Sequence, residues 1–364
     1  MKRFFLLFLL FLLCSISLSA NADNTPPFIR ILLKASQTIT INGSEIEVID
    51  PFSFLPITST FSGRVNISFN ESGILLNQKP ILKTYIIIKG KKSVEVDGKI
   101  YPGKTEVILR DGVLYLINDI DLETYITGVV ASEMPTEWPV EVLKAQAVAA
   151  RTYAYNLLRK NRDALYDLTA THIHQVYNGI HRASPNVLLA VEHTRGEVLT
   201  YKGELIEPYY HSHCAGQTES SFYIWEREIP YLQSVKCFHT DKRRWEASIS
   251  KKKLSSKIGL SNIKDVKILK RSPSGRVLRI YFSDGNRKII MSGEDIRRIA
   301  GYNEIKSTLF DVKDAVDSII FKGEGMGHGV GMCQWGAYEM AKRGYNYRQI
   351  LLHYYKGVDI LKIY

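Results

Sequence analysis

Residues 122–155, LETYITGVVASEMPTEWPVEVLKAQAVAARTYAY, decide the fold of this 364-residue chain. In the first part of the stretch, apolar residues recur at positions i, i+3, i+4, i+7 and i+8, which is the spacing of one helix face. These residues are Leu122, Tyr125, Ile126, Val129 and Val130. Asp121 stands at the expected N-cap position. We therefore predict a helix that begins after Asp121 and ends at about Ser132.

A second helix is predicted from Val140 to about Lys160. Pro135 and Pro139 come just before it, and proline suits the first turn of a helix. The middle of this segment, residues 145–150, is rich in alanine. Because alanine side chains are small, we expect neighbouring elements to pack closely against this helix.

Strands are predicted on both sides of these helices. Short β-branched runs separated by turn residues fill positions 28–117, and strand character returns at 198–213 and 262–291. Two further helices are predicted at 334–343 and 347–355. The elements do not alternate as in a doubly wound sheet. We predict an α+β fold, with a helical core packed on mixed or antiparallel β sheets and a β-rich N-terminal unit.

The first 22 residues have the pattern of a secretory signal peptide. Lys2 and Arg3 are followed by an apolar run at 4–13 and by a small-residue cleavage site, Ala20-Asn21-Ala22. A retained anchor is the alternative, although the apolar run is about half of the roughly 20 residues that span a bilayer. We predict an exported protein, in the periplasm or cell wall or on the outer face of the cytoplasmic membrane.

The chain is basic, with a net charge of +11 at pH 7. Subtracting the two positive charges of the leader leaves +9. A basic exported protein is attracted to anionic polymers, which outside a bacterial membrane means wall glycans and phosphates. Lysine and arginine are scattered, with short runs only at 89–92, 242–244 and 251–253. We therefore predict no nucleic-acid partner.

Glycine occupies alternate positions in GEGMGHGVGMCQWG, residues 323–336. The spacing is not that of a dinucleotide-binding loop, and no phosphate-loop lysine follows, so we predict no nucleotide partner. Alternating glycines remove the side chains from one face of an extended segment. Either another backbone or a bulky sugar can then approach closely, while His328, Gln334 and Trp335 remain to hydrogen-bond and stack.

Glu133 is a candidate for acid and base chemistry, because it stands at the end of one predicted helix and just before the next, although the residues alone favour a structural role. The negative pole of the first helix raises the pKa of a carboxyl group there, as a general acid requires. A solvated glutamate in a tight turn is the alternative. Lys144 and Arg151, seven residues apart, point the same way at about 10 Å. They either hold carbonyls or carboxylates of a polymer or form a solvated basic stripe.

A cluster of histidines and cysteines supplies candidate metal ligands. The candidates are His211, His213, Cys214, Cys237 and His239. Imidazole and thiolate groups bind Zn²⁺ in tetrahedral sites. A Cys214–Cys237 disulfide in an oxidising compartment, and free thiols, are the alternatives, with Cys333 as a buried apolar residue. A cysteine nucleophile beside a histidine is also possible in principle.

Several of these segments resemble the stage II sporulation protein D family, also called the SpoIID/LytB family. The main match runs from Tyr125 to Ala154. It recurs at Gln175-x-Tyr177-x-Gly179, Tyr209-Tyr-His-Ser212, Gly216-x-Thr218-Glu219 and Gly327–Ala337. After the signal peptide at 1–22 and the β-rich unit at 23–117, which the residues themselves predict, the resemblance implies a catalytic region at 118–239, a variable α/β insertion at 240–320, and a Gly-rich loop with helices at 321–364 that complete the catalytic domain.

The resemblance implies a peptidoglycan lytic transglycosylase that cuts MurNAc-GlcNAc glycan strands, stripped of their peptides, into 1,6-anhydro products. Glu133 would be the single acid and base, and no cofactor is required, although a structural Zn²⁺ is possible. The residues expected at the substrate are Lys144, Arg151, Gln146, Gln175, Tyr177, Tyr210, Ser212, His328, Gln334 and Trp335. The alternative is a non-catalytic wall-binding protein that stimulates an N-acetylmuramoyl-L-alanine amidase.

Overall fold

The computed structural model describes residues 25–171, 173–239 and 241–364. The predicted signal peptide lies outside the described residues. Within them, no helix is long and apolar enough to cross a membrane. The predicted α+β class is confirmed. The chain contains both helices and strands, and the strands form mixed and antiparallel sheets.

The N-terminal part is an eleven-stranded sheet with the path β11-β1-β10-β9-β6-β2-β3-β4-β5, to which β7 and β8 are added beside β2. Its neighbouring strands are antiparallel except for β1 and β11, which run parallel. The strands are β1 (Phe28–Ser36), β2 (Ile39–Ile49), β3 (Phe61–Asn70), β4 (Gly73–Leu76), β5 (Lys79–Pro80), β6 (Tyr85–Lys89), β7 (Ser93–Val96), β8 (Lys99–Pro102), β9 (Lys104–Arg110), β10 (Val113–Asp121) and β11 (Leu168–Thr169).

The helical core follows this sheet and is completed by the C-terminal segment. It contains α1 (Leu122–Glu133), α2 (Val140–Lys160), α3 (Pro185–His193), α4 (Ser221–Trp225), α7 (Gln334–Lys342) and α8 (Tyr347–Tyr354). Two small sheets join its parts: β12 (Glu197–Tyr201) with β13 (Glu204–Leu205) and β22 (Asp359–Lys362), and β14 (Tyr210–His211) with β21 (Met332–Cys333). The helices predicted at 122, 140, 334 and 347 are confirmed to within two residues at each end.

One hydrophobic core connects the N-terminal sheet to the helices. Ile31 and Leu116 of the sheet belong to the same buried cluster as Tyr125 of α1 and Val148 of α2. The connection begins where β10 ends, because α1 starts at the next residue. The Asp121 side chain caps α1 by accepting a 3.0 Å hydrogen bond from the Thr124 backbone N–H, as predicted.

The insertion has a hydrophobic core of its own, built around Trp245, Phe282 and Phe321. It consists of two three-stranded antiparallel sheets, β15-β20-β19 and β16-β17-β18, with two helices. The elements are β15 (Arg244–Ser250), α5 (Lys251–Ile258), β16 (Asp265–Arg271), β17 (Val277–Ser283), β18 (Lys288–Met291), α6 (Gly293–Ala300), β19 (Phe310–Asp314) and β20 (Ser318–Glu324). The strand character predicted at 262–291 is confirmed.

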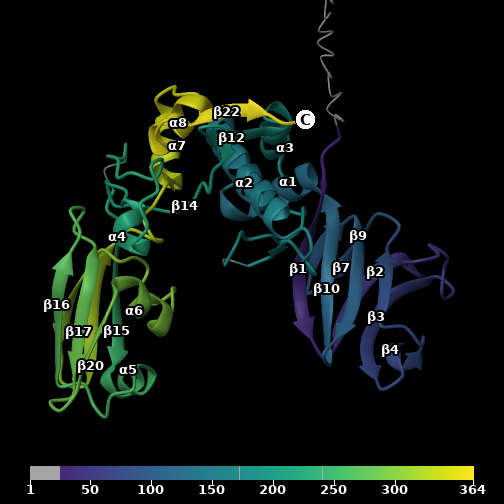
Figure 1. The fold of residues 1–364 in the computed structure, drawn as a ribbon, viewed down its shortest axis with the longest axis horizontal. Coiled ribbons are helices and arrows are strands. Elements are labelled where there is room, and N and C mark those ends of the chain that lie inside the picture. Colours follow the sequence, from purple (N-terminus) through teal and green to yellow (C-terminus); the bar gives the residue numbers. More distant parts are fainter. Residues whose placement is uncertain (1–24, 172, 240) are drawn as a thin grey trace, which may run out of the picture.

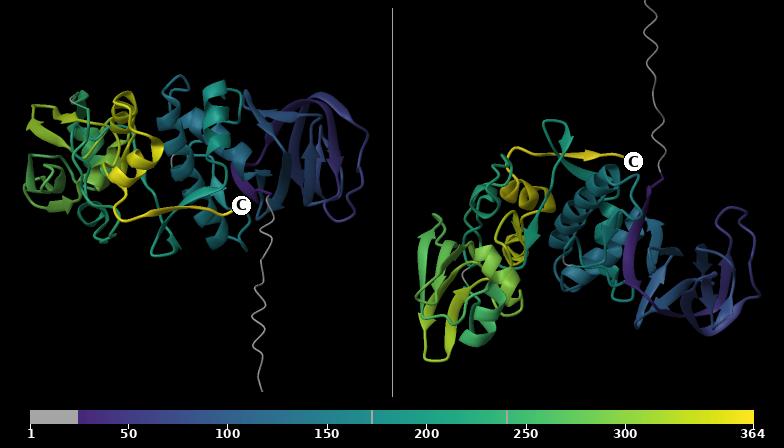
Figure 2. Two further views of the ribbon diagram at one scale, coloured as in Figure 1. Left: turned by 90° about the horizontal axis from the view of Figure 1, so that it is seen from above. Right: turned by 60° about the horizontal axis from the view of Figure 1, so that its bottom comes forward.

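The three parts lie next to one another along the longest axis of the molecule. Figure 1 shows the N-terminal sheet at one end, the insertion at the other, and α1, α2, α7 and α8 between them. The two further views in Figure 2 show the same order. The functional candidates named above from 133 to 239 and from 328 to 335 therefore belong to the middle part.

Arg151 is buried inside this middle part and does not form a basic surface with Lys144. Its guanidinium group donates hydrogen bonds of 2.8 and 2.7 Å to the two carboxylate oxygens of Glu123 on α1. Lys144 instead forms a 2.8 Å ion pair with Glu141. The charge of Arg151 is therefore used within the core, and its role at the substrate stays a prediction.

We predict that Arg151→Met destabilises the protein by about 3–5 kcal/mol, because it leaves the Glu123 carboxylate buried without its partner. The free energy of unfolding in urea measures this effect. Lys144→Met is the matched control on the same helix, and because its ion pair is partly exposed, we expect a loss of about 1 kcal/mol or less. Equal losses in the two variants would contradict the importance of the buried pair.

Candidate active site

Glu133 is the last residue of α1, and its side chain points to the loop after β11. Its Oε1 atom accepts a 2.9 Å hydrogen bond from the Val176 backbone N–H. Beside it, the Ser132 hydroxyl accepts a 3.2 Å hydrogen bond from the Asn178 backbone N–H. The helix ends here because Pro135 disfavours a helical conformation at Met134, which is extended. The Glu133 side chain is half-buried and therefore keeps an accessible edge.

Burial raises the pKa of the Glu133 carboxyl group from its usual 4.5 to about 7. Hydrogen bonds from the Val176 backbone and from the Tyr210 and Gln334 side chains oppose this rise, because they stabilise the charged form. The direction agrees with the sequence-based expectation, but burial rather than the helix pole is the main cause. Near neutral pH this carboxyl group can both donate and accept a proton, as acid and base catalysis requires.

Tyr210 is held at Glu133 by a chain of hydrogen bonds. The Tyr210 hydroxyl accepts a 3.2 Å hydrogen bond from Gln175 Nε2, and Gln175 Oε1 accepts one of the same length from the Tyr125 hydroxyl. Gln175 also donates to the Ala150 carbonyl of α2 at 3.2 Å. Because Gln175 is buried, it positions Tyr210 rather than contacting a substrate directly.

Gln334 reaches Glu133 from the first position of α7. Its Nε2 atom donates to Gln146 Oε1 of α2 at 3.5 Å. Gln146 is fully buried, and its own Nε2 atom has no partner among the described residues. The predicted glycan contact of Gln146 is therefore not supported, and this side chain instead orients Gln334.

Two other predicted substrate residues are also used inside the protein. Tyr177 is fully buried, and its hydroxyl donates to Asn118 Oδ1 at 3.1 Å. Ser212 is half-buried, and its carbonyl accepts a 3.2 Å hydrogen bond from the Trp335 backbone N–H. Burial removes the Tyr177 ring from solvent, and its glycan contact stays a prediction.

The Gly-rich loop packs against other parts of the protein. Close approach of another backbone was one of the two alternatives that the alternating glycines offered. Gly325, Gly327, Gly329 and Gly331 all have positive φ angles between 72° and 104°. A Cβ atom on Gly331 would lie 2.0 Å from the Tyr209 carbonyl oxygen, and one on Gly329 would lie 2.5 Å from Arg276 Cζ. Glycine is therefore required by both conformation and space.

His328 is the half-buried side chain that this loop presents toward β14. Its Nε2 atom donates to the Tyr210 carbonyl at 3.0 Å, and its Nδ1 atom accepts from the Val330 N–H at 3.1 Å. Burial lowers the pKa of His328 to about 3, so the ring is neutral. It fixes the backbone of Tyr210 and stands 5.6 Å, between ring centres, from the exposed Trp225.

Trp335 belongs to an aromatic group that flanks Glu133. Its ring centre is 5.0 Å from that of Trp138, in the turn after Glu133, and 5.6 Å from that of Tyr338. Trp335 is half-buried, so part of its ring remains accessible. Of the predicted substrate residues, Tyr210 and Gln334 hydrogen-bond Glu133, and Trp335 is the residue that follows Gln334.

A group of four metal-binding side chains lies at the ends of β14 and β21. The Cys214, Cys237 and Cys333 sulfur atoms and the His239 ring converge within 4.8 Å of one another. His239 Nε2 is 3.2 Å from Cys214 Sγ and 3.5 Å from Cys333 Sγ, which fits neighbouring ligands of a tetrahedral ion. His239 Nδ1 donates to the Asp241 carbonyl at 3.0 Å, which directs Nε2 into the group.

This arrangement corrects three sequence-based assignments. The three cysteines are free, so the alternative Cys214–Cys237 disulfide is not formed. Cys333 is a member of the group rather than an isolated apolar residue. His211 and His213 are not members, because His211 Nδ1 bonds the Val330 carbonyl and His213 Nδ1 bonds the Ala215 N–H.

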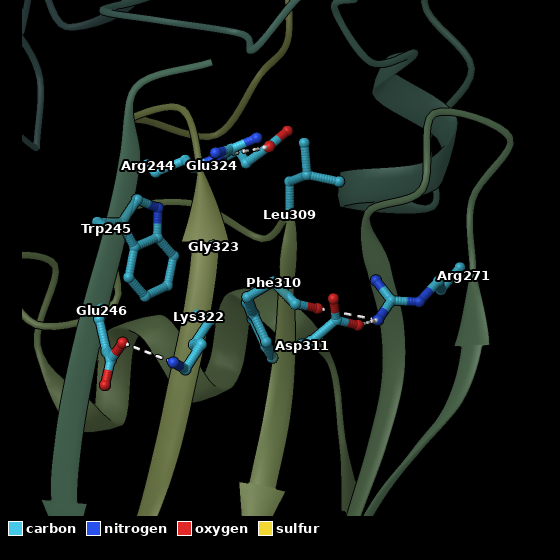
Figure 3. A pocket seen from close by; sticks show the side chains of 10 residues that line it. All are labelled: Arg244, Trp245, Glu246, Arg271, Leu309, Phe310, Asp311, Lys322, Gly323 and Glu324. Carbon is cyan, nitrogen blue, oxygen red and sulfur yellow. Dashed lines mark hydrogen bonds and ion pairs between the residues drawn. The ribbon is translucent and has the colours of Figure 1, made fainter.

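A separate hollow lies on the β15-β20-β19 sheet of the insertion (Figure 3). Its charged side chains are paired within the protein: Arg244 with Glu324, Lys322 with Glu246, and Arg271 with Asp311. Trp245 and Phe310 line it but are themselves buried. Because each carboxylate that lines it is paired with a cation, Glu133 remains the better candidate for catalysis.

Two family models match parts of this chain. A family model described as stage II sporulation protein matches residues 110–201, and one described as a domain of unknown function matches residues 211–331. An uncharacterised protein of Brachyspira hyodysenteriae is 32% identical over 337 residues, which are 90% of each chain.

Two named relatives are similar over shorter stretches. An amidase enhancer of Bacillus subtilis is 31% identical over 65% of this chain and 40% of its own length. A stage II sporulation protein D of Bacillus amyloliquefaciens is 34% identical over 313 residues, which are 80% of this chain and 88% of the relative. On these matches, and as its motifs predicted, the chain belongs to the stage II sporulation protein D family.

Proposed function

We propose that this protein is an exported peptidoglycan lytic transglycosylase that cuts MurNAc-GlcNAc strands with Glu133 as its single acid and base. The observation that carries the proposal is the raised pKa of one accessible carboxyl group, held by Val176, Tyr210 and Gln334. Among the described residues, no second carboxylate contributes to that pKa. Hydrolases of glycosidic bonds ordinarily use two carboxyl groups. The second one either activates a water molecule or acts as the nucleophile.

One carboxyl group is enough if the substrate supplies its own nucleophile. Protonated Glu133 donates its proton to the glycosidic oxygen as the bond from C1 to that oxygen breaks. The muramic acid O6 then bonds to C1, and its proton returns to the Glu133 carboxylate. No water is consumed, the catalyst is regenerated, and the product is a 1,6-anhydro sugar. Tyr210 and Gln334 stabilise the carboxylate between the two proton transfers.

The proposed location and partners follow from charge and from the relatives. The net charge of +11 favours the anionic polymers of the wall. The relative named amidase enhancer supports a role at the cell wall and a link to an amidase. We retain stimulation of an amidase, without catalysis, as the competing function; an intact site at Glu133 favours the transglycosylase.

We further propose that Cys214, Cys237, His239 and Cys333 hold a structural Zn²⁺. The four donors fill a tetrahedral ion completely, which is typical of structural rather than catalytic zinc. Cys333 is the residue before Gln334, and β21 pairs with β14, which carries Tyr210. The ion would therefore fix the two short strands from which both side chains extend to Glu133.

We predict that Glu133→Gln reduces the rate of strand cleavage by about 10²-fold or more, because the amide cannot donate and recover a proton. The measurement is the initial rate of shortening of peptide-free glycan strands. Glu137→Gln, an exposed glutamate four residues later, is the control and should keep the wild-type rate. Similar rates for wild type and Glu133→Gln would contradict the assignment.

The pH dependence should report the pKa of Glu133. Because the acid must be protonated in the free enzyme, kcat/KM is expected to fall as pH rises through about 7. Tyr210→Phe removes a donor that lowers this pKa, so the falling limb should move to higher pH. A limb that stays in place, or moves to lower pH, would show that another group controls the rate.

We predict that the purified protein contains one zinc ion per chain and that Cys333→Ser loses it, with a lower melting temperature. Elemental analysis and thermal unfolding measure the two effects. His213→Gln is the control, because His213 lies beside the group but is not a member, and the variant should retain zinc. Zinc-free wild-type protein with full thermal stability would contradict the proposed site.

A further inference from the structure

Arg243 stands out among the basic residues around the middle part of the molecule. Its guanidinium carbon lies 4.8 Å from the centre of the Trp335 ring. The residue is exposed, and no carboxylate of the described residues forms an ion pair with it. The Asp241 carboxylate accepts a 3.0 Å hydrogen bond from the Arg243 backbone N–H, and it forms no ion pair with the guanidinium group.

The two neighbouring basic residues are already occupied. Lys242 donates to the Ala215 carbonyl at 2.9 Å, and Arg244 pairs with Glu324 at 3.5 Å. Arg243 has a positive φ angle of 45°, and β15 begins at the next residue.

Stacking on Trp335 leaves the binding edge of Arg243 free. A guanidinium group that lies over an aromatic ring uses its flat face, whereas its N–H donors point outward in its own plane. Those donors match the two oxygens of a carboxylate. The guanidinium group of Arg243 is therefore held against Trp335, is exposed to solvent and can bind an anion.

The position of this cation relates it to Glu133. Trp335 directly follows Gln334, whose side chain hydrogen-bonds Glu133. Trp335 also packs on Trp138, which lies in the turn five residues after Glu133. Arg243 thus lies over a pair of aromatic rings, Trp335 and Trp138. Each of the two follows a residue of the candidate site closely in sequence. The aromatic pair under Arg243 is therefore connected to Glu133 through Gln334 and through the turn that carries Trp138.

We propose that Arg243 binds a carboxylate on the substrate sugar and so selects glycan strands whose muramic acid carries a free lactyl group. This inference rests on the proposed function. In muramic acid the lactyl carboxyl group is blocked as an amide while a stem peptide is attached, and it becomes a free carboxylate when the peptide is removed. A bidentate arginine distinguishes the two forms, because an amide presents no negative charge.

The test measures strand binding by the full-length mature protein carrying Glu133→Gln, so that no cleavage occurs. Peptide-free glycan strands are compared with the same strands after conversion of their lactyl carboxylates to methyl amides. We expect the unconverted strands to bind about tenfold more tightly or better, as for hydrogen bonds to a charged group. Adding Arg243→Gln should abolish this preference.

Arg244→Gln is the matched control, because Arg244 is the adjacent arginine and is already paired with Glu324. It should keep the preference for carboxylate-bearing strands. Arg243→Lys keeps the charge but loses the planar fork, and an intermediate preference is expected. Equal binding of both strand forms by the parent protein, or a preference that survives Arg243→Gln, would overturn the inference.

A wall phosphate polymer is the other anion that this cation meets outside the cell. If such a polymer displaces glycan strands only when Arg243 is present, and amidation of the strands does not change their binding, the carboxylate assignment is wrong. Failure of the proposed function is distinguishable, since wild-type protein would then leave the strands uncut although the binding preference persists. Cleavage without an Arg243-dependent preference would overturn only the present inference.

Discussion

The buried ion pair between Glu123 and Arg151 is the interaction on which the arrangement of the middle part depends. One Glu123 carboxylate accepts hydrogen bonds from the Arg151 guanidinium group, the Gly196 backbone N–H and the Tyr364 hydroxyl. These groups come from α2, from the turn before β12 and from the C-terminal residue. The pair therefore joins α1 to segments that are distant in sequence. The donors to the Glu123 carboxylate all come from the protein itself.

Fixing α1 at its first turn also fixes Glu133 at its last residue. Because β10 runs directly into α1, the N-terminal sheet supports the other side of the same helix. Glu133 can then remain half-buried between the Val176 loop and the Tyr210 and Gln334 side chains. Burial and the hydrogen bonds act in opposite directions on its pKa, and the balance of about 7 depends on keeping both at these positions.

Local patterns predicted much of the fold, whereas the site required contacts that no local pattern contains. The spacing from Leu122 to Val130 and the Asp121 cap predicted α1, because periodicity and capping act within a few residues. The burial of Arg151 was not predicted, since it depends on Glu123, 28 residues earlier. Cys333 was missed as a possible ligand because its neighbour Cys214 is brought near by pairing of β14 with β21, 119 residues apart. Glu133 was identified from the family resemblance, while the cause of its raised pKa needed the structure.

The central claim is that Glu133 cuts glycan strands without water. Its most direct test is mass spectrometry of the new strand ends formed from peptide-free glycan in water enriched in oxygen-18. The account predicts ends that have lost one water, as in a 1,6-anhydro sugar, and that contain no oxygen-18. Reducing ends labelled with oxygen-18 would contradict it, because they require water as the nucleophile and a further group to activate it.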